Sequence, residues 1–288
     1  MHLATKSGAF YVKVRVKYNI LILVGMAMMD KQSFLKALQV ETENFNSAVS
    51  TPSGDWIIKG FIDIARNIYT ISVDTKVISK IMELLLFPEL SRFAEKHNLK
   101  MVLAEQQNFY PDISFVDDEN KRYALDLKST YRVDDNRVNG MTLGAFTGYF
   151  RERTSTKNIT FPYGSYAGHY VLGVIYSKLD GEVDERKRYS LDELESITSV
   201  VRDFQFFAQE KYRVAIDRPG SGNTKNIGSV TKIDQLKNGT GPFSELGVKI
   251  FDEYWSYYLT NDMARAAELE NRPYTNLKSF LKYRGLDK

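Results

Sequence analysis

The sequence predicts an α/β (α+β) fold, in which helices flank a mixed β-sheet of five or more strands. Strand-like apolar segments alternate along the chain with segments of helical periodicity, which is typical of a sheet covered by helices. The 288 residues are 43% apolar and 26% charged, an ordinary globular composition that can form a core without crosslinks. No repeat or low-complexity linker divides them, so residues 26–288 are expected to form one domain.

Residues 1–25 are expected to be an N-terminal extension, either upstream of the true start or forming a short extra strand. The apolar run that follows Tyr18 spans only about ten residues, too few to cross a bilayer as a helix. Met26, Met28 or Met29 could serve as the start, because a helical pattern begins at Asp30. A signal peptide is the alternative interpretation, because Lys13, Arg15 and Lys17 precede the apolar run, but the helical pattern that begins at Asp30 favours an extension. We therefore expect no membrane association.

The N-terminal half of the domain is predicted to begin with a helix over residues 30–46. Strands follow at residues 56–62 and 67–71, separated by a turn. Asp74 is a typical N-cap for the next helix, whose apolar positions recur at helical spacing until an interruption near Pro88.

The middle of the chain carries three predicted strands, at residues 99–104, 113–116 and 122–130. The last two flank the polar cluster Asp117–Lys121, which indicates a tight turn and hence a hairpin. Residues 142–153 are predicted to be helical.

The last third is predicted to contain a buried strand at residues 169–177 and one or two strands within residues 202–216. Residues 220–228 read GSGNTKNIG and are predicted to form a loop, because glycine and asparagine tolerate positive φ. The tail from Pro242 onward is predicted to be mostly helical. Together these strands and helices complete the predicted mixed sheet.

Composition narrows the possible chemistry. The absence of cysteine excludes disulfides, thiolate zinc sites and a thiol nucleophile. Only three histidines are present, which makes a multi-histidine metal site a poor fit. A metal would therefore need oxygen ligands, which favours Mg²⁺ or a similar hard cation. The net charge of +3 neither requires nor excludes nucleic acid.

One pattern of charged residues predicts a reactive site. If the hairpin turn is centred on Glu119, residue i faces residue 238 − i, so Asp112 lies opposite Asp126 on the same face. Lys128 shares that face because strand side chains alternate, whereas Leu127 points away into apolar packing. Two carboxylates and an amine are thus predicted to converge on one side of a sheet.

Such a trio suits metal-assisted phosphodiester hydrolysis. Two adjacent carboxylates repel each other unless a cation lies between them, and Mg²⁺ binds two carboxylates together with waters and a phosphate oxygen. The lysine can orient or deprotonate the attacking water, or offset charge on the phosphate. A glycosidase also pairs two carboxylates, but it does not need the cationic third member.

The spacing alone leaves a second interpretation open, a half-exposed strand with ordinary charges facing outward. The pattern Asp/Glu-x-Lys occurs four times, although only the copy at Asp126 lies in an apolar strand. Pro-Asp occurs once, at Pro111-Asp112, in the register that a hairpin requires.

The motif Pro111-Asp112 followed by Asp126-Leu-Lys128 resembles the PD-(D/E)xK nuclease superfamily, and its surroundings resemble EcoRV-like type II restriction endonucleases. The similar stretches run in the same order over roughly residues 74–230, ending with the GSGNT-x-NIGS loop. The resemblance implies a restriction-endonuclease-like core with dimerisation and DNA-binding subregions. It also implies that Asp112 and Asp126 bind Mg²⁺, with Mn²⁺ as a substitute, that Lys128 is the catalytic lysine, and that Glu83 is a further acidic residue at the site.

The resemblance also implies DNA contacts. The loop would read bases in the major groove, the segment before Pro111 would follow the minor groove, and the remaining residues would contact phosphates or nearby DNA. These residues are Gly220, Ser221, Gly222, Asn223, Thr224 and Asn226 in the loop; Gln106, Gln107 and Asn108; and Thr75, Lys76, Tyr131, Thr147 and Lys157. Glycines allow close backbone approach and asparagine can pair with adenine, in agreement with these roles.

The implied activity is Mg²⁺-dependent cleavage of double-stranded DNA by a bacterial cytoplasmic homodimer. The implied target is the palindrome GATATC, cut at its centre to leave blunt ends, with a cognate DNA methyltransferase in the host. Two alternatives remain: a structure-specific resolvase or repair nuclease of the same fold, and a catalytically idle DNA-binding protein.

Overall fold

The computed structural model of the chain describes residues 11–15, 21–25, 29–179, 184, 186–220 and 225–287. Near the N-terminus, β1 (Tyr11–Arg15) and β2 (Leu21–Gly25) pair antiparallel in a two-stranded sheet of their own. A short extra strand was one of the two expectations for residues 1–25, and the described part of that segment contains two. No described helix is both long and apolar enough to cross a membrane.

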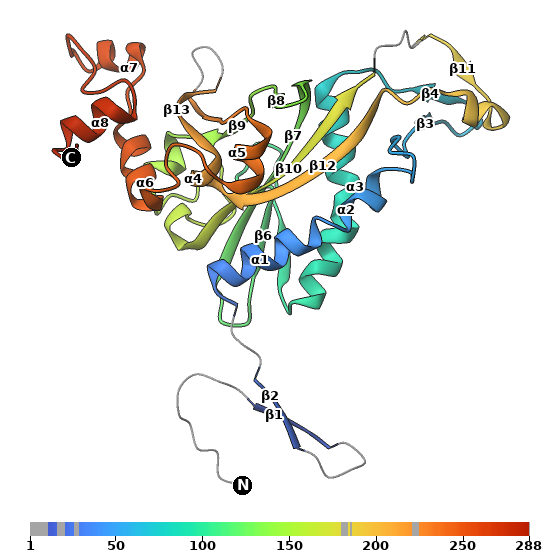
Figure 1. Cartoon of the computed structure of the whole chain (residues 1–288), viewed down its shortest axis with the longest axis horizontal. Coiled ribbons are helices and arrows are strands. Elements are labelled where there is room, and N and C mark those ends of the chain that lie inside the picture. The colour runs from blue at the N-terminus through green and yellow to red at the C-terminus, as the bar shows by residue number, and fades with distance from the viewer. Residues whose placement is uncertain are drawn as a thin grey trace.

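A mixed sheet forms the centre of the molecule and confirms the predicted class (Figure 1). β10 runs parallel to β7, and the other neighbours in the main path are antiparallel. Its strands, in spatial order, are β12 (Val201–Glu210), β10 (Tyr166–Lys178), β7 (Arg122–Asp134), β6 (Ile113–Val116) and β5 (Lys100–Leu103), with the short β8 (Arg137–Val138) paired to the end of β7. The predicted strands at residues 99–104, 113–116, 122–130 and 169–177 all belong to this sheet.

Three N-terminal helices cover one face of the sheet: α1 (Lys31–Glu41), α2 (Phe45–Val49) and α3 (Thr75–Lys96). Asp74 caps α3 as predicted, because its side chain accepts hydrogen bonds from the backbone N–H groups of Lys76 and Val77. Residues 30–46 are one helix and the start of a second, not one continuous helix.

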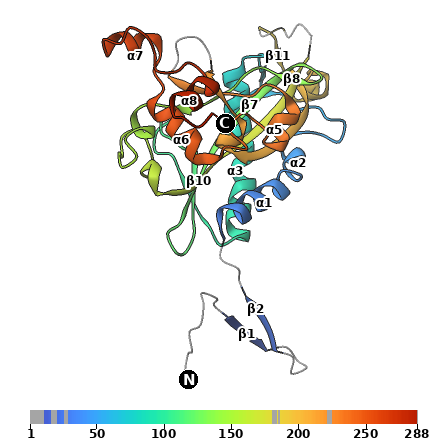
Figure 2. The ribbon, with the colours of Figure 1, turned by 60° about the vertical axis from the view of Figure 1, so that its left-hand side comes forward.

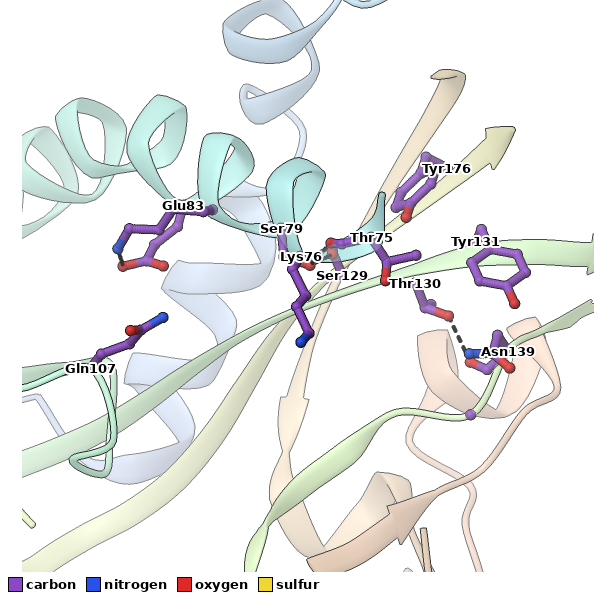
Figure 3. Close-up of a pocket in the computed structure, with 12 residues that line it drawn as sticks. Thr75, Lys76, Ser79, Glu83, Gln107, Ser129, Thr130, Tyr131, Asn139 and Tyr176 are labelled. Atoms are coloured by element: carbon purple, nitrogen blue, oxygen red, sulfur yellow. Dashed lines mark hydrogen bonds and ion pairs between the residues drawn. The ribbon is translucent and has the colours of Figure 1, made fainter. Parts of the chain in front are cut away.

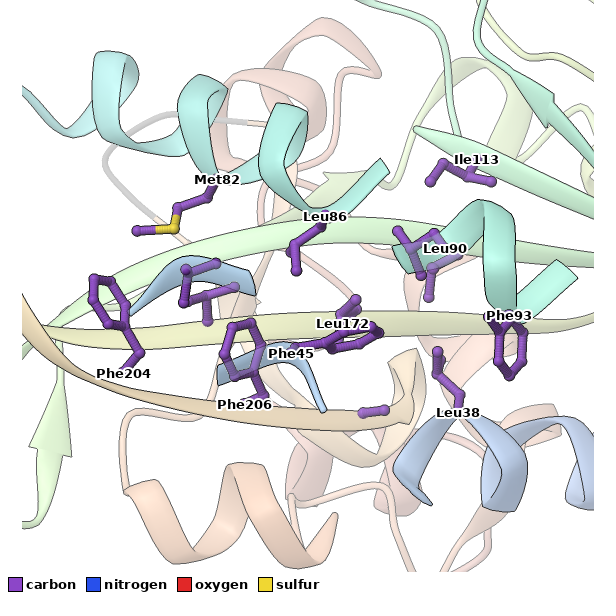
Figure 4. Packing of buried hydrophobic residues seen from close by; sticks show 14 of the residues in the cluster. Leu38, Phe45, Met82, Leu86, Leu90, Phe93, Ile113, Leu172, Phe204 and Phe206 are labelled. Atoms are coloured by element: carbon purple, nitrogen blue, oxygen red, sulfur yellow. The ribbon is translucent and has the colours of Figure 1, made fainter. Parts of the chain in front are cut away.

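The predicted interruption at Pro88 is wrong, since α3 continues through it. Leu86 and Leu90 on either side of the proline are buried in the same core as Phe93 (Figure 4). Their burial, worth about 1.5–3 kcal/mol per side chain, offsets the hydrogen bond that proline cannot make.

A small three-stranded sheet is built from two separate parts of the chain, one between α2 and α3 and the other between β10 and β12. It consists of β3 (Gly60–Ile62), β4 (Ile68–Thr70) and β11 (Arg188–Tyr189), followed by the 3₁₀ helix η3 (Leu191–Ser196). β3 is shorter than the predicted strand over residues 56–62. Phe61, Ile62 and Ile64 are more than half exposed, so this sheet leaves apolar surface uncovered.

The predicted helix over residues 142–153 is wrong. Residues 142–145 form strand β9 (Thr142–Ala145), which pairs with β14 (Asn226–Ser229), and β14 in turn pairs with β13 (Ala215–Pro219). The short 3₁₀ helix η1 (Gly148–Phe150) follows. Gly144 and Gly148 have φ values of +86° and +56°, outside the right-handed helical region, so the backbone cannot continue as an α-helix here.

The C-terminal helices cover the opposite face of the sheet (Figure 2). The tail is mostly helical, as predicted, and packs through the buried aromatic residues Phe251, Tyr254 and Trp255. The predicted strand region 202–216 is divided, because α4 separates β12 from β13. The remaining elements are η2 (Tyr163–Ser165), α4 (Lys211–Val214), α5 (Ile233–Asn238), α6 (Gly247–Tyr257), α7 (Asn261–Ala266) and α8 (Leu277–Tyr283).

Candidate functional site

The β6–β7 hairpin has the predicted register. Ile113 pairs with Leu125 and Ser114 with Ala124, so each pair of residue numbers sums to 238. The turn closes where the Asp117 N–H donates to the Lys121 carbonyl at 3.0 Å. Asp112 immediately precedes β6, and continuing the register places it opposite Asp126.

Three charged side chains converge at this end of the hairpin. Lys128 Nζ lies 2.7 Å from Asp126 Oδ2 and 3.7 Å from Asp112 Oδ2. The backbone N–H of Leu127 donates to Asp112 Oδ2 at 2.6 Å, which holds the Asp112 carboxylate against β7. Leu125 and Leu127 contribute to the apolar core on the other face of the sheet, as alternation predicts.

The electrostatics of the pair reflect crowding of negative charge. Burial, together with the neighbouring Asp126 carboxylate, raises the pKa of Asp112 to about 7, although the Lys128 ammonium acts in the opposite direction. Burial alone would lower the pKa of Lys128, but the attraction of Asp126 and Asp112 outweighs it and raises that pKa. Lys128 is therefore a cation at neutral pH.

The donor set fits a hard divalent cation. Asp126 is 4% exposed, and its Oδ2 has no hydrogen-bond partner within the described residues, only the nearby Lys128 ammonium. Two adjacent carboxylates are oxygen ligands of the kind that Mg²⁺ prefers. The described residues contain no group of three histidine or acidic side chains clustered as metal ligands, so any further ligands would be backbone, solvent or substrate oxygens.

Glu83 lies on α3 beside the trio without joining it. Its Oε1 accepts from Lys80 Nζ at 2.8 Å, and it shares a cavity of about 390 Å³ with Asp112 and Lys128. The polar stripe of α3 therefore faces the site, although Glu83 as a metal ligand remains a prediction.

The trio lies in a groove made of three adjoining cavities of about 340, 390 and 700 Å³. The two smaller cavities share Ser79, Glu83 and Ser129, and the two larger ones share Asp112 and Lys128. Figure 3 shows the 340 Å³ cavity, with Glu83 and Gln107 on opposite sides of it. The lining of the groove includes further charged, hydroxyl and amide side chains beside the trio.

Most of the predicted DNA-contacting residues lie along this groove. Thr75, Lys76, Tyr131 and Gln107 line the 340 Å³ cavity. The 700 Å³ cavity is lined by Asp112, Asp126 and Lys128 and by the predicted residues Gln107, Asn108, Thr147, Lys157 and Asn226.

Two other predicted contacts, Gln106 and Gly220, do not line these cavities. Gln106 is exposed next to Gln107. Gly220 directly follows β13, and its N–H donates to the Asn226 carbonyl at 3.0 Å. Ser221, Gly222, Asn223 and Thr224 lie outside the described residues.

Sequence reasoning missed several residues of the groove. Ser79 and Ser129 hydrogen-bond to each other at 2.7 Å where α3 meets β7. Both serines lie close in sequence to predicted site residues, because Ser129 directly follows Lys128 and Ser79 lies between Lys76 and Glu83. This proximity could have identified them as groove residues. The sequence carries no such signal for Tyr149 and Asn139, because their places in the groove depend on how β8, β9 and η1 pack.

Comparison with known proteins places this geometry in a family. The family model described as restriction endonuclease EcoRV matches residues 52–285. The type II restriction enzyme EcoRV of Escherichia coli is 34% identical over 231 residues, which cover 78% of this chain and 91% of that protein. The solved structure of NlaIV restriction endonuclease aligns with 86% of this chain and 94% of its own, with 11% identity and a TM-score of 0.37.

Proposed function

Starting from the fact that the chain belongs to the EcoRV restriction endonuclease family, and is thus a type II restriction endonuclease that hydrolyses phosphodiesters, we propose that it cuts double-stranded DNA with Mg²⁺. The proposed target is the palindrome GATATC, cut at its centre to leave blunt ends. The observation that carries the proposal is the convergence of Asp112, Asp126 and Lys128 within one polar groove.

Asp112 and Asp126 would hold the metal, with Mn²⁺ as a substitute and Glu83 as a further acidic residue beside it. When bound, the metal supplies a Lewis acid that polarises the phosphate and lowers the pKa of a bound water. The chain holds the two carboxylates in position. The β6–β7 register places Asp112 opposite Asp126, and the Leu127 N–H donates to the Asp112 carboxylate.

Lys128 acts as a partly buried cation next to the reacting phosphate. Because the two carboxylates keep its pKa raised, its ammonium is protonated at neutral pH and can donate to phosphate oxygens. A positive charge held in a partly buried groove stabilises the negative charge that develops during hydrolysis. Lys128 could deprotonate the attacking water only after its pKa had fallen, which requires the negative charge of the two carboxylates to be partly neutralised.

The remaining groove residues would bind and read the duplex. Gln107 and Asn108 carry amide groups suited to the acceptors of the minor groove, and Asn226 can pair with adenine in the major groove. A central TA step is easily kinked, so deformation can add specificity at base pairs that the protein does not touch. Lys76 and Lys157 would contact phosphates.

A homodimer matches a palindromic target by symmetry. The small sheet supports this part of the proposal, because Phe61, Ile62 and Ile64 are 55%, 59% and 104% exposed on or beside β3. Adjoining exposed apolar residues of this kind are typical of protein interaction surfaces. In a bacterial cytoplasm, a cognate methyltransferase would protect the host's own GATATC sites.

Digestion of plasmid DNA tests the proposal directly. Purified protein with Mg²⁺ should produce discrete fragments, and sequencing their ends should show blunt cuts within GATATC. Cleavage at branched DNA irrespective of sequence would instead indicate a resolvase or repair nuclease. Tight binding with no product would indicate an idle site.

A further inference from the structure

Lys211 is a buried cation that the proposed mechanism does not use. It is the first residue of α4 and is 1% exposed. Its Nζ has no hydrogen-bond partner within the described part of the chain. An ammonium group that is buried without such a partner costs free energy, so its presence in a core calls for an explanation.

The ammonium lies directly behind the reactive groove. A Cβ built on Gly144 would be only 3.3 Å from Lys211 Nζ, and Gly144 lines the 700 Å³ cavity together with Asp112 and Asp126. Gly144 thus separates the amine from the groove by the thickness of one backbone. A larger residue at Gly144 would occupy the space next to the amine.

Aromatic rings surround the amine in place of hydrogen-bond acceptors. Lys211 Nζ lies 4.6 Å from the centroid of the Tyr110 ring and 5.8 Å from those of Phe150 and Tyr163. Tyr110 immediately precedes Pro111-Asp112, and its hydroxyl is 3.0 Å from His169 Nδ1. The cation therefore contacts the segment that carries one of the two carboxylates.

The second carboxylate acts on the same amine. Burial lowers the pKa of Lys211 to about 8, and the attraction of Asp126 opposes that effect. The net result leaves Lys211 mostly protonated at neutral pH. Lys211 thus contacts the ring of Tyr110, two residues before Asp112, and is attracted to Asp126.

We propose that Lys211 is a positioning residue for DNA cleavage, a buried cation that fixes the relative positions of Asp112 and Asp126 from behind the groove. The inference rests on the proposed function. Lys211 acts through Tyr110 and Asp126 and does not itself reach the groove. Groups that support metal ligands from behind have effects of about 10–100-fold on activity when removed.

The test compares full-length wild type, Lys211→Met and the control Lys121→Met. Methionine has a similar length and no charge. Lys121 donates to the Met29 carbonyl at 3.1 Å at the far end of the same hairpin, away from the groove. Three quantities are measured: the single-turnover cleavage rate at saturating Mg²⁺, the Kd for a target duplex without metal, and the Tm.

We expect Lys211→Met to cleave about tenfold or more slowly, with a Kd within about twofold of wild type, because the side chain does not contact DNA. Its Tm should be unchanged or higher, since an unpaired buried charge has been removed. Lys121→Met should cleave at the wild-type rate. Lys211→Arg, which keeps the charge, should cleave faster than Lys211→Met.

Three results would overturn the inference. The first is a wild-type cleavage rate in Lys211→Met. The second is a slower rate accompanied by a lower Tm and weaker DNA binding, which indicates a purely structural role. The third is a slower cleavage rate in Lys211→Arg than in Lys211→Met. If wild type itself cuts no DNA, the proposed function fails, an outcome that is visible before any variant is compared.

Discussion

The two walls of the groove are built differently. One wall is the β6–β7 hairpin, a regular ladder that places Lys128 within 4 Å of both Asp112 and Asp126 in sequence-determined register. The other wall consists of β9, η1 and β14, whose pairing is interrupted and whose backbone includes the positive φ values of Gly144 and Gly148. Regular backbone carries the proposed chemistry, and irregular backbone carries the proposed recognition residues Thr147 and Asn226.

This difference has a physical basis. Catalysis requires reactive groups held to within a fraction of an ångström, which hydrogen-bonded strands provide. Reading a base edge requires close approach of backbone and short side chains, which glycine-containing turns allow. We therefore expect substitutions on the hairpin wall to affect the cleavage step, and substitutions on the β9–β14 wall to affect binding and specificity.

The largest effect is expected on the hairpin wall. Asp126→Asn, Asp112→Asn or Lys128→Met should each slow cleavage roughly a thousandfold or more, because the two carboxylates would hold the metal and the Lys128 ammonium would stabilise the charge on the reacting phosphate. Binding of the target duplex without metal should change far less. The measurement is single-turnover cleavage of a plasmid with one target site, alongside a duplex-binding titration.

Lys121→Met, at the turn of the same hairpin, serves as the matched control and should retain full activity. Full activity in any of the three site variants would remove that residue from the proposed mechanism. Equal losses of duplex affinity and cleavage rate in these variants would contradict the expectation that the hairpin wall acts in cleavage and the β9–β14 wall in binding.

The hairpin wall was predictable from sequence for reasons that the other wall lacks. Strand alternation and a polar turn at Asp117–Lys121 fix the register, so residues 14 apart in the chain could be placed face to face. Local patterns also predicted the cap at Asp74 and the helical tail. All of these depend on interactions between residues close in sequence.

The β9–β14 wall depends on contacts that are distant in sequence. Residues 142–153 contain apolar residues at helical spacing, yet β9 pairs with β14, more than 80 residues away. Tertiary packing also decided the course of α3 through Pro88, where burial of Leu86 and Leu90 outweighed the local signal. Lys211 carried no sequence signal at all, since only the packing of α4 brings it behind Gly144.

On the β9–β14 wall, Asn226→Ala should lower affinity for the target duplex by about 10–100-fold, equivalent to about 1–3 kcal/mol for one lost bidentate base contact. Discrimination between the target and a duplex with one altered A·T pair should shrink, while the maximal cleavage rate at saturating DNA stays close to wild type. Competition binding with both duplexes gives the measurement. A variant that binds both as wild type does, yet cleaves slowly, would place Asn226 in the chemistry instead.

Lys157→Met should have a smaller and sequence-independent effect. Lys157 lines the 700 Å³ cavity, and loss of one phosphate contact in each subunit of the proposed dimer should reduce the slope of log affinity against log salt by about two. Target and non-target duplexes should lose affinity equally, several-fold at moderate salt. An unchanged slope in a salt titration would exclude a phosphate contact, and a loss confined to the target would make Lys157 a base-reading residue.

The smallest expected effect is on stability, and it also separates the walls. The pKa of Asp112 in the folded protein is about 7, above its ordinary value of 3.8, so between these values the folded state keeps a proton that the unfolded state releases. Stability contributed by this group is therefore present at low pH and lost as pH rises through 7. Asp112→Asn avoids that loss, and without metal its advantage over wild type should grow by about 1 kcal/mol between about pH 6.3 and 8. Thermal unfolding in EDTA at several pH values measures it, with Asn226→Ala as the control whose Tm difference stays constant. An advantage of Asp112→Asn that does not change with pH would mean that burial beside Asp126 does not raise the pKa of Asp112.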